Sequence, residues 1–149
     1  MTVLLQEADF KADDVIARHL DTGLRTGAVV SFVGLVRQDD DGSLRVMTLE
    51  HYPGMAQRTL ENLENSARGR FDLNSLVILH RYGRLEPGDR IMMVATASAH
   101  RTEAFAAAEF LMDFLKTDAP FWKKEDRKQG GSWVDAKNSD DEKRGAWMA

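Results

Sequence analysis

The residues best suited to chemistry lie at the two ends of one apolar stretch in the second half of the chain. His100 and Arg101 precede this stretch, Lys116 closes it, and Lys123 follows shortly afterwards. An imidazole and a guanidinium at the start of a helix favour anion binding, because free backbone N–H groups and the helix dipole reinforce their charge. Two neighbouring ammonium groups suit a carboxyl or phosphate group, and burial or crowding turns a lysine into a usable base or nucleophile.

Each of these residues also has a simpler explanation. His100 and Arg101 are typical of a solvated helix end, and Lys116 suits a helix C-terminus, where the dipole favours the charged form. Lys123 is equally typical of a solvent-facing strand. Arg37, directly after a β-branched segment, suits bidentate phosphate binding and a solvated turn equally well. The residues alone therefore indicate a basic anion pocket without fixing a reaction.

The stretch between these charged ends predicts a buried helix. Apolar residues recur along it at helical spacing, including Phe105, Leu111 and Leu115. We expect Ser98 to cap its start and Pro120 to end it near residues 116–118. At about 1.5 Å per residue, roughly 22 Å separate Arg101 from Lys116. One small substrate does not bridge that distance, so we predict either two sites or one site shared between two copies of the chain.

The other predicted elements indicate an α+β fold with a mostly antiparallel sheet. β-Branched and aromatic residues predict a central strand over residues 27–36, in which Gly34 marks a bulge or a close backbone approach. An acidic loop leads to a strand over residues 44–52. We expect this strand to form a hairpin with the strand over residues 27–36. Helices are predicted over residues 11–20 and 55–70, and further strands over 2–5, 76–82, 90–97, 121–125 and 132–134.

Composition limits the possible functions. The net charge of −4 argues against broad nucleic-acid binding. No apolar run reaches the ~20 residues of a membrane helix, and no secretory signal is visible, so we expect a cytoplasmic protein. The absence of cysteine excludes disulfides, thiolate nucleophiles and cysteine-based metal sites. The histidines lack metal-binding spacing and no phosphate-loop or hydrolase motif occurs, so we expect neither metal nor cofactor.

Five stretches, in order, make the chain resemble the large, catalytic subunit of molybdopterin synthase. They read Gly-Ala-Val-Val-Ser-Phe-Val-Gly-Leu-Val-Arg, Leu-Glu-His-Tyr-Pro-Gly-Met, His-Arg-Tyr-Gly-Arg-Leu-Glu-Pro-Gly-Asp, Ser-Ala-His-Arg and Leu-Lys-Thr-Asp-Ala-Pro-Phe-Trp-Lys-Lys-Glu. The resemblance implies an α/β-hammerhead-type fold with an added small α+β part. It also implies one domain of two intertwined lobes over residues 1–137, followed by a charged tail over 138–149.

The resemblance implies a sulfurtransferase of molybdenum cofactor biosynthesis. Such an enzyme converts cyclic pyranopterin monophosphate into molybdopterin by inserting two sulfurs as a dithiolene. The sulfur arrives as a thiocarboxylate on the C-terminal glycine of a small ubiquitin-like partner. The implied assembly is a heterotetramer, in which a central homodimer of large subunits carries one small subunit at each end.

The substrate-contacting positions of the family fall on Arg37, His100, Arg101, Lys116, Lys123, Lys124 and Glu125. The resemblance implies that Lys116 and Lys123 are catalytic and that Glu125 orients a lysine. It leaves open which lysine acts as acid, base or covalent acceptor, and in which order the two sulfurs are added. Leu35 stands where the family often has a lysine, so no side-chain cation is expected there.

Two other classes of function remain open from the residues alone. A non-catalytic anion- or nucleotide-binding module would bind phosphate esters without depending on a partner's tail. A metal-dependent hydrolase would lose activity to a chelator.

Overall fold

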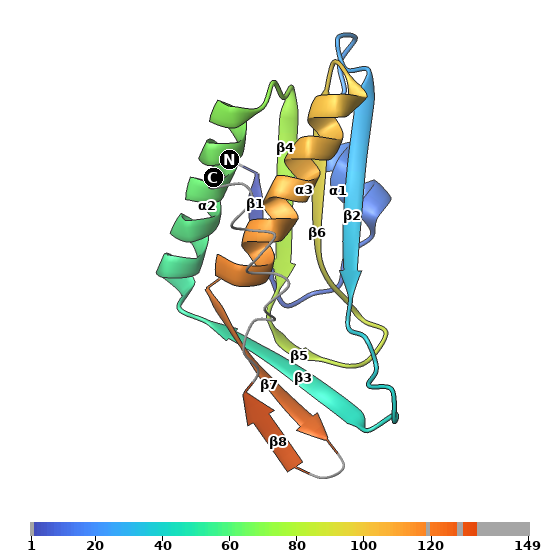
Figure 1. The fold of residues 1–149 in the computed structure, drawn as a ribbon, viewed down its shortest axis with the longest axis vertical. Helices are drawn as coiled ribbons and strands as arrows, with labels where there is room; N and C mark the ends of the chain where they lie inside the picture. The colour runs from blue at the N-terminus through green and yellow to red at the C-terminus, as the bar shows by residue number, and fades with distance from the viewer. Residues whose placement is uncertain (1, 119, 128–129, 134–149) are drawn as a thin grey trace.

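Two four-stranded sheets and three helices make up the residues that the structure describes, which are 2–118, 120–127 and 130–133 of a computed structural model (Figure 1). In chain order the elements are β1 Val3–Gln6, α1 Ala12–His19, β2 Ala28–Leu35, β3 Leu44–His51, α2 Pro53–Arg70, β4 Ser75–Arg81, β5 Gly83–Leu85, β6 Arg90–Ser98, α3 Arg101–Asp118, β7 Phe121–Arg127 and β8 Gly130–Trp133. The expected boundary at residue 137 and the tail over 138–149 lie outside the described residues.

The first sheet has the order β1-β4-β6-β2, and only its β1–β4 pair is parallel. Its two inner strands, β4 and β6, are buried along almost their whole length. Alternate side chains face opposite layers: Ile78 and Val94 lie in the core beneath α2 and α3, whereas Val77 and Met93 lie in the core beneath α1. Strands covered on both faces are expected to be continuously apolar, as these are.

The second sheet has the order β5-β3-β7-β8, with antiparallel pairs throughout. The predicted hairpin between β2 and β3 is therefore wrong, because β3 pairs with β5 and β7 instead. The apolar residues Leu44, Met47 and Leu49 of β3 form a separate core with Val36 and Leu85. The predicted strands over residues 121–125 and 132–134 are confirmed as β7 and β8, as is the mostly antiparallel α+β class.

β2 lies at the edge of the first sheet and not at its centre, which corrects the sequence prediction. Its apolar side chains are accordingly open to solvent: Val29 and Phe32 are each 43% exposed and Leu35 is 59% exposed. Phe105 of the neighbouring helix α3, predicted to be buried, is 62% exposed. The bulge expected at Gly34 is confirmed by a register shift between Gly34 and Leu35. Proteins normally cover an exposed apolar edge strand of this kind with another segment or with a second chain.

Helix α3 runs from Arg101 to Asp118 and ends just before Pro120, as predicted. The expected N-cap is wrong, because Ser98 belongs to β6 and its hydroxyl donates to the carbonyl oxygen of Asp72 at 2.7 Å. α3 lies along β2 and runs in the same direction (Figure 1). Both elements therefore connect the same two ends of the molecule. Within the described part of the chain, no helix is long and apolar enough to cross a membrane.

Candidate functional site

The predicted site residues fall into two groups at opposite ends of α3. His100 and Arg101 are exposed at its start, next to the beginning of β2, where the Gly27 N–H donates to the Ser98 carbonyl oxygen at 3.0 Å. Lys116 is exposed in its last turn. Over 18 residues the helix spans about 27 Å. The two groups therefore do not meet within one chain.

Lys116 and Lys123 lie on either side of Pro120, the first in the last turn of α3 and the second on β7, which continues beyond the end of that helix (Figure 1). Lys123 is half-buried and lies opposite Leu49 of β3, on the sheet face that also carries His51 and Phe121. The positive charges of Lys123 and Lys116 contribute to lowering the pKa of His80. Both lysines therefore belong to the same end of α3, and their joint role in one site stays a prediction.

Lys124 does not share the sheet face of Lys123. Side chains alternate along β7, so Lys124 is exposed on the outer face together with Trp122, whereas Lys123 and Glu125 are half-buried on the inner face. On that outer face the Trp122 ring packs edge-on against the Tyr52 ring, with centroids 4.6 Å apart. Of these two neighbouring lysines, Lys123 lies on the face of the candidate site. Lys124 lies on the other face and serves as a matched control for substitutions of the site lysines.

Arg37 lies at the lysine end of the molecule. It follows β2, about 26 Å along the strand from the end that meets His100. It forms an exposed ion pair with Asp40 at 2.8 Å. In the same loop Asp39 pairs with Arg127 of β7 at 2.6 Å, and Arg127 also contacts the carboxylate of Glu125. Bonding to Arg127 lowers the pKa of Asp39, so the loop after β2 is tied to the strand that carries Lys123.

The position of Arg37 and these ion pairs add to the sequence analysis. Arg37, which the sequence assigned to neither end of α3, lies within one chain at the end that carries Lys116. Glu125 was expected to orient a lysine, and the structure places its carboxylate against Arg127. Glu125 and Lys123 share the inner face of β7.

Two histidines that sequence reasoning set aside lie beside the lysines. The His80 ring stacks on the Phe121 ring with centroids 4.0 Å apart, and its Nδ1–H donates to the Arg81 carbonyl oxygen at 2.8 Å. The His51 ring packs edge-on against Tyr82 at 4.5 Å. Its buried Nδ1 has no hydrogen-bond partner among the described residues. In the sequence, the sign of a functional role for these histidines is that each lies near the end of a predicted strand.

Burial makes His80 sensitive to acid. Burial above all, together with the charges of the two lysines, lowers its pKa from the ordinary value of 6.5 to about 4. Between pH 6.5 and about pH 4, His80 binds a proton in the unfolded chain but not in the folded chain. The free energy of unfolding therefore falls as pH falls. We expect a loss on the order of 3 kcal/mol between neutral pH and about pH 4.

Urea unfolding of His80→Phe against wild type, followed across this pH range, tests this expectation. Phenylalanine keeps a ring to stack on Phe121 but cannot titrate, so much of the pH dependence below about 6.5 should disappear. An unchanged slope in His80→Phe would assign the acid sensitivity to other groups.

The described residues offer no group of three or more histidine, aspartate or glutamate side chains that could hold a metal ion. The chemistry available at this end of α3 is that of two ammonium groups near imidazole and aromatic rings. Such groups bind anions, stabilise an oxyanion and exchange protons.

Comparison with known proteins connects this arrangement to one family. The family model described as MoaE protein matches residues 5–118. A molybdopterin synthase catalytic subunit of Cereibacter sphaeroides is 50% identical over 147 residues, which cover 99% of this chain and 100% of the relative.

Solved structures agree with the sequence match. The molybdopterin biosynthesis MoaE protein from Burkholderia ambifaria superposes with a TM-score of 0.84 at 44% identity, over 99% of this chain and 98% of that one. A chain from the Helicobacter pylori complex of subunits 1 and 2 of molybdopterin-converting factor has a TM-score of 0.66 at 19% identity, over 92% and 90% of the two chains, a likeness that shows the fold. Since sequence and fold match along almost the entire length, the chain belongs to the MoaE family of molybdopterin synthase catalytic subunits.

Proposed function

We propose that this enzyme moves two sulfurs from the thiocarboxylated C-terminal glycine of a small ubiquitin-like partner onto cyclic pyranopterin monophosphate, and that it does so in the cytoplasm. Family membership supports the reaction class. The composition supports the external donor, because a chain without cysteine has no thiol of its own to supply the sulfur. The observation that carries the proposal is the placement of Lys116 in the last turn of α3 and of Lys123 on the inner face of β7, at the same end of that helix.

We further propose that each active site is shared between two copies of the chain. An exposed apolar edge strand such as β2 can be covered by the β2 of a second copy, running antiparallel about a two-fold axis. Antiparallel pairing places the end of one β2 against the start of the other. The end of one copy that carries Arg37, Lys116 and Lys123 then lies next to His100 and Arg101 of the second copy. One site thereby gathers the groups that α3 separates within one chain.

The roles follow from charge and position. Arg37, with His100 and Arg101 from the second copy, holds the substrate phosphate and pterin, since guanidinium groups bind phosphate bidentately. Lys116 and Lys123 stabilise the partner's thiocarboxylate and the oxyanion formed when its sulfur is transferred. Glu125 acts as a positioning residue through Arg127. The buried Nδ1 of His51, which has no hydrogen-bond partner among the described residues, offers this site one further hydrogen-bonding atom.

The small partner completes the proposed heterotetramer, with one copy at each end of the homodimer. The related Helicobacter pylori chain comes from a complex of two different subunits. Lys116 lies in the last turn of α3 and Lys123 on β7, so we expect the partner's tail to approach the molecule where α3 ends and β7 begins (Figure 1).

Reconstitution tests the proposed function. The purified chain is mixed with cyclic pyranopterin monophosphate and with partner that carries either a C-terminal thiocarboxylate or an ordinary carboxylate. We expect dithiolene product only with the thiocarboxylate, at two sulfurs for each pterin. Pterin binding without product in both mixtures would instead identify a non-catalytic anion-binding module.

A further inference from the structure

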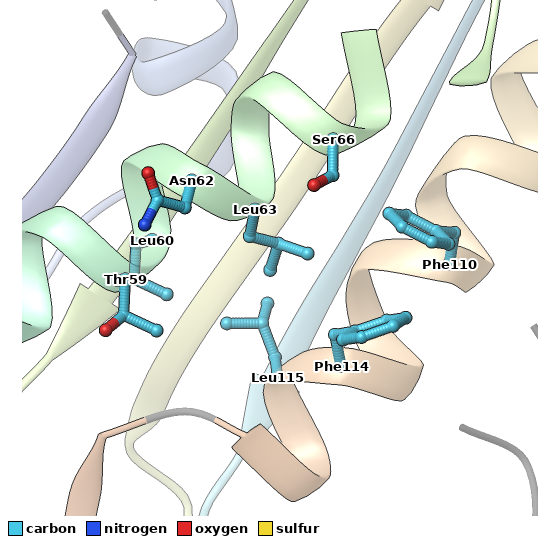
Figure 2. A pocket seen from close by; sticks show the side chains of 8 residues that line it. All are labelled: Thr59, Leu60, Asn62, Leu63, Ser66, Phe110, Phe114 and Leu115. Atoms are coloured by element: carbon cyan, nitrogen blue, oxygen red, sulfur yellow. The ribbon is translucent and has the colours of Figure 1, made fainter. Parts of the chain in front are cut away.

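An apolar groove between α2 and α3 has no part in the proposed reaction. It has a volume of about 190 Å³, and Leu60 and Leu63 of α2 face Phe110, Phe114 and Leu115 of α3 across it. Figure 2 shows these side chains pointing toward one another, with the polar groups of Asn62 and Ser66 at the rim on the α2 side. Water in such a groove would lack hydrogen-bond partners, so an apolar side chain is the better occupant.

The α3 wall of the groove suits an aromatic occupant. The Phe110 and Phe114 rings lie 4.8 Å apart, and the Phe71 ring meets Phe110 edge-on at 5.5 Å. An added ring can extend such a row through further offset or edge contacts.

The last residues of this chain contain a large aromatic side chain of this kind. Residues 143–149 read Lys-Arg-Gly-Ala-Trp-Met-Ala, in which Trp147 and Met148 follow the basic pair Lys143 and Arg144. They are also the only large apolar residues after Val134. The segment thus combines one aromatic anchor with two positive charges at short spacing.

The path of the chain makes the groove reachable. β8 runs antiparallel to β7, and its last residue, Trp133, lies opposite Lys124 near the start of β7. β7 itself begins directly after α3, so the chain leaves β8 at the α3 end that carries Leu115. The remaining residues 134–149 span up to about 50 Å when extended, more than the length of the groove.

We propose that the C-terminal segment 143–149 docks into the α2–α3 groove of its own chain. The Trp147 ring fills the cavity against Phe110 and Phe114. The docked segment joins α2 to α3 beside Lys116, the residue that follows Leu115 of the groove wall.

Disulfide trapping tests this docking, because the chain has no cysteine of its own. Ser66→Cys, at the rim of the groove, is combined with Met148→Cys in the full-length chain. The matched control combines Met148→Cys with Asn65→Cys, since Asn65 is exposed on α2 but does not line the groove. Oxidised glutathione serves as the two-electron acceptor, and the products are followed by non-reducing gel and mass spectrometry.

We expect an intrachain disulfide to form at least about tenfold faster in the groove pair than in the control, because docking raises the local thiol concentration. Adding Trp147→Ala should remove that advantage. Equal rates in the two pairs would overturn the proposal. A disulfide between two chains at high dilution would overturn it as well, since it would show that the occupant comes from a second copy. Neither outcome depends on sulfur transfer, so this test can fail while the proposed function stands.

Discussion

Replacing Lys116 by alanine is expected to abolish dithiolene formation while leaving the fold intact. Its ammonium group is exposed in the last turn of α3, and the side chain packs into no described core, so truncation removes charge and little else. Loss of a group that stabilises a developing oxyanion or moves a proton lowers turnover by about 100-fold to 10,000-fold. Lys123→Ala should have an effect of the same size.

Lys124→Ala is the matched control for this loss. Lys124→Ala removes one positive charge, as Lys123→Ala does, but from the adjacent position of β7 on the outer face of the sheet. We expect its turnover to stay within about threefold of wild type, since an exposed charge away from the site contributes little. Thermal unfolding of all three variants verifies the fold. Equal turnover in Lys116→Ala and Lys124→Ala would contradict the proposed role of Lys116.

The second large effect is expected at the middle of β2. Phe32→Glu places a carboxylate on an edge strand that, in the proposed homodimer, meets its own copy near the two-fold axis. Two unpaired charges buried in an apolar interface cost several kcal/mol, so the dimer should dissociate. Because each site takes His100 and Arg101 from the second copy, turnover should be lost together with the dimer.

Sedimentation velocity of Phe32→Glu, with turnover measured on the same sample, tests this expectation. Ala17→Glu, at an exposed position of α1 on the opposite side of the first sheet, adds the same charge and should remain dimeric and active. A monomeric Phe32→Glu variant with normal turnover would show that one chain holds a complete site.

Local sequence signals predicted most elements and failed where a distant segment decided the outcome. The helical spacing of apolar residues and Pro120 located α3 to within a few residues. The hairpin from β2 to β3 failed because β3 pairs with β7, more than seventy residues away. No local pattern distinguishes these pairings, since either one covers the apolar residues of β3.

The error at β2 has a different cause. A continuously apolar strand is normally covered on both sides, so the sequence favoured a central position. In one chain the strand is an edge, and its Val29 and Phe32 are exposed; the proposed second copy would cover them. Similarly, the spacing of Arg101 and Lys116 indicated that the site residues divide into two groups. It could not assign Arg37 to the lysine group, because that depends on the direction of β2 relative to α3.

His51 and His80 were overlooked for a related reason. They lie far apart in sequence, and neither has metal-binding spacing. Their association appears only once β3, β4 and β7 bring both rings against Phe121.

Complementation between two inactive variants tests the shared site most directly. Lys116→Ala and Arg101→Ala chains are each assayed alone and then after unfolding and refolding together with the small partner. A mixed dimer has one site with both substitutions and one with neither, so a random mixture should recover about a quarter of wild-type turnover. Recovery to this level is the predicted result. A mixture as inactive as its components, with mixed dimers verified by mass spectrometry, would contradict the account.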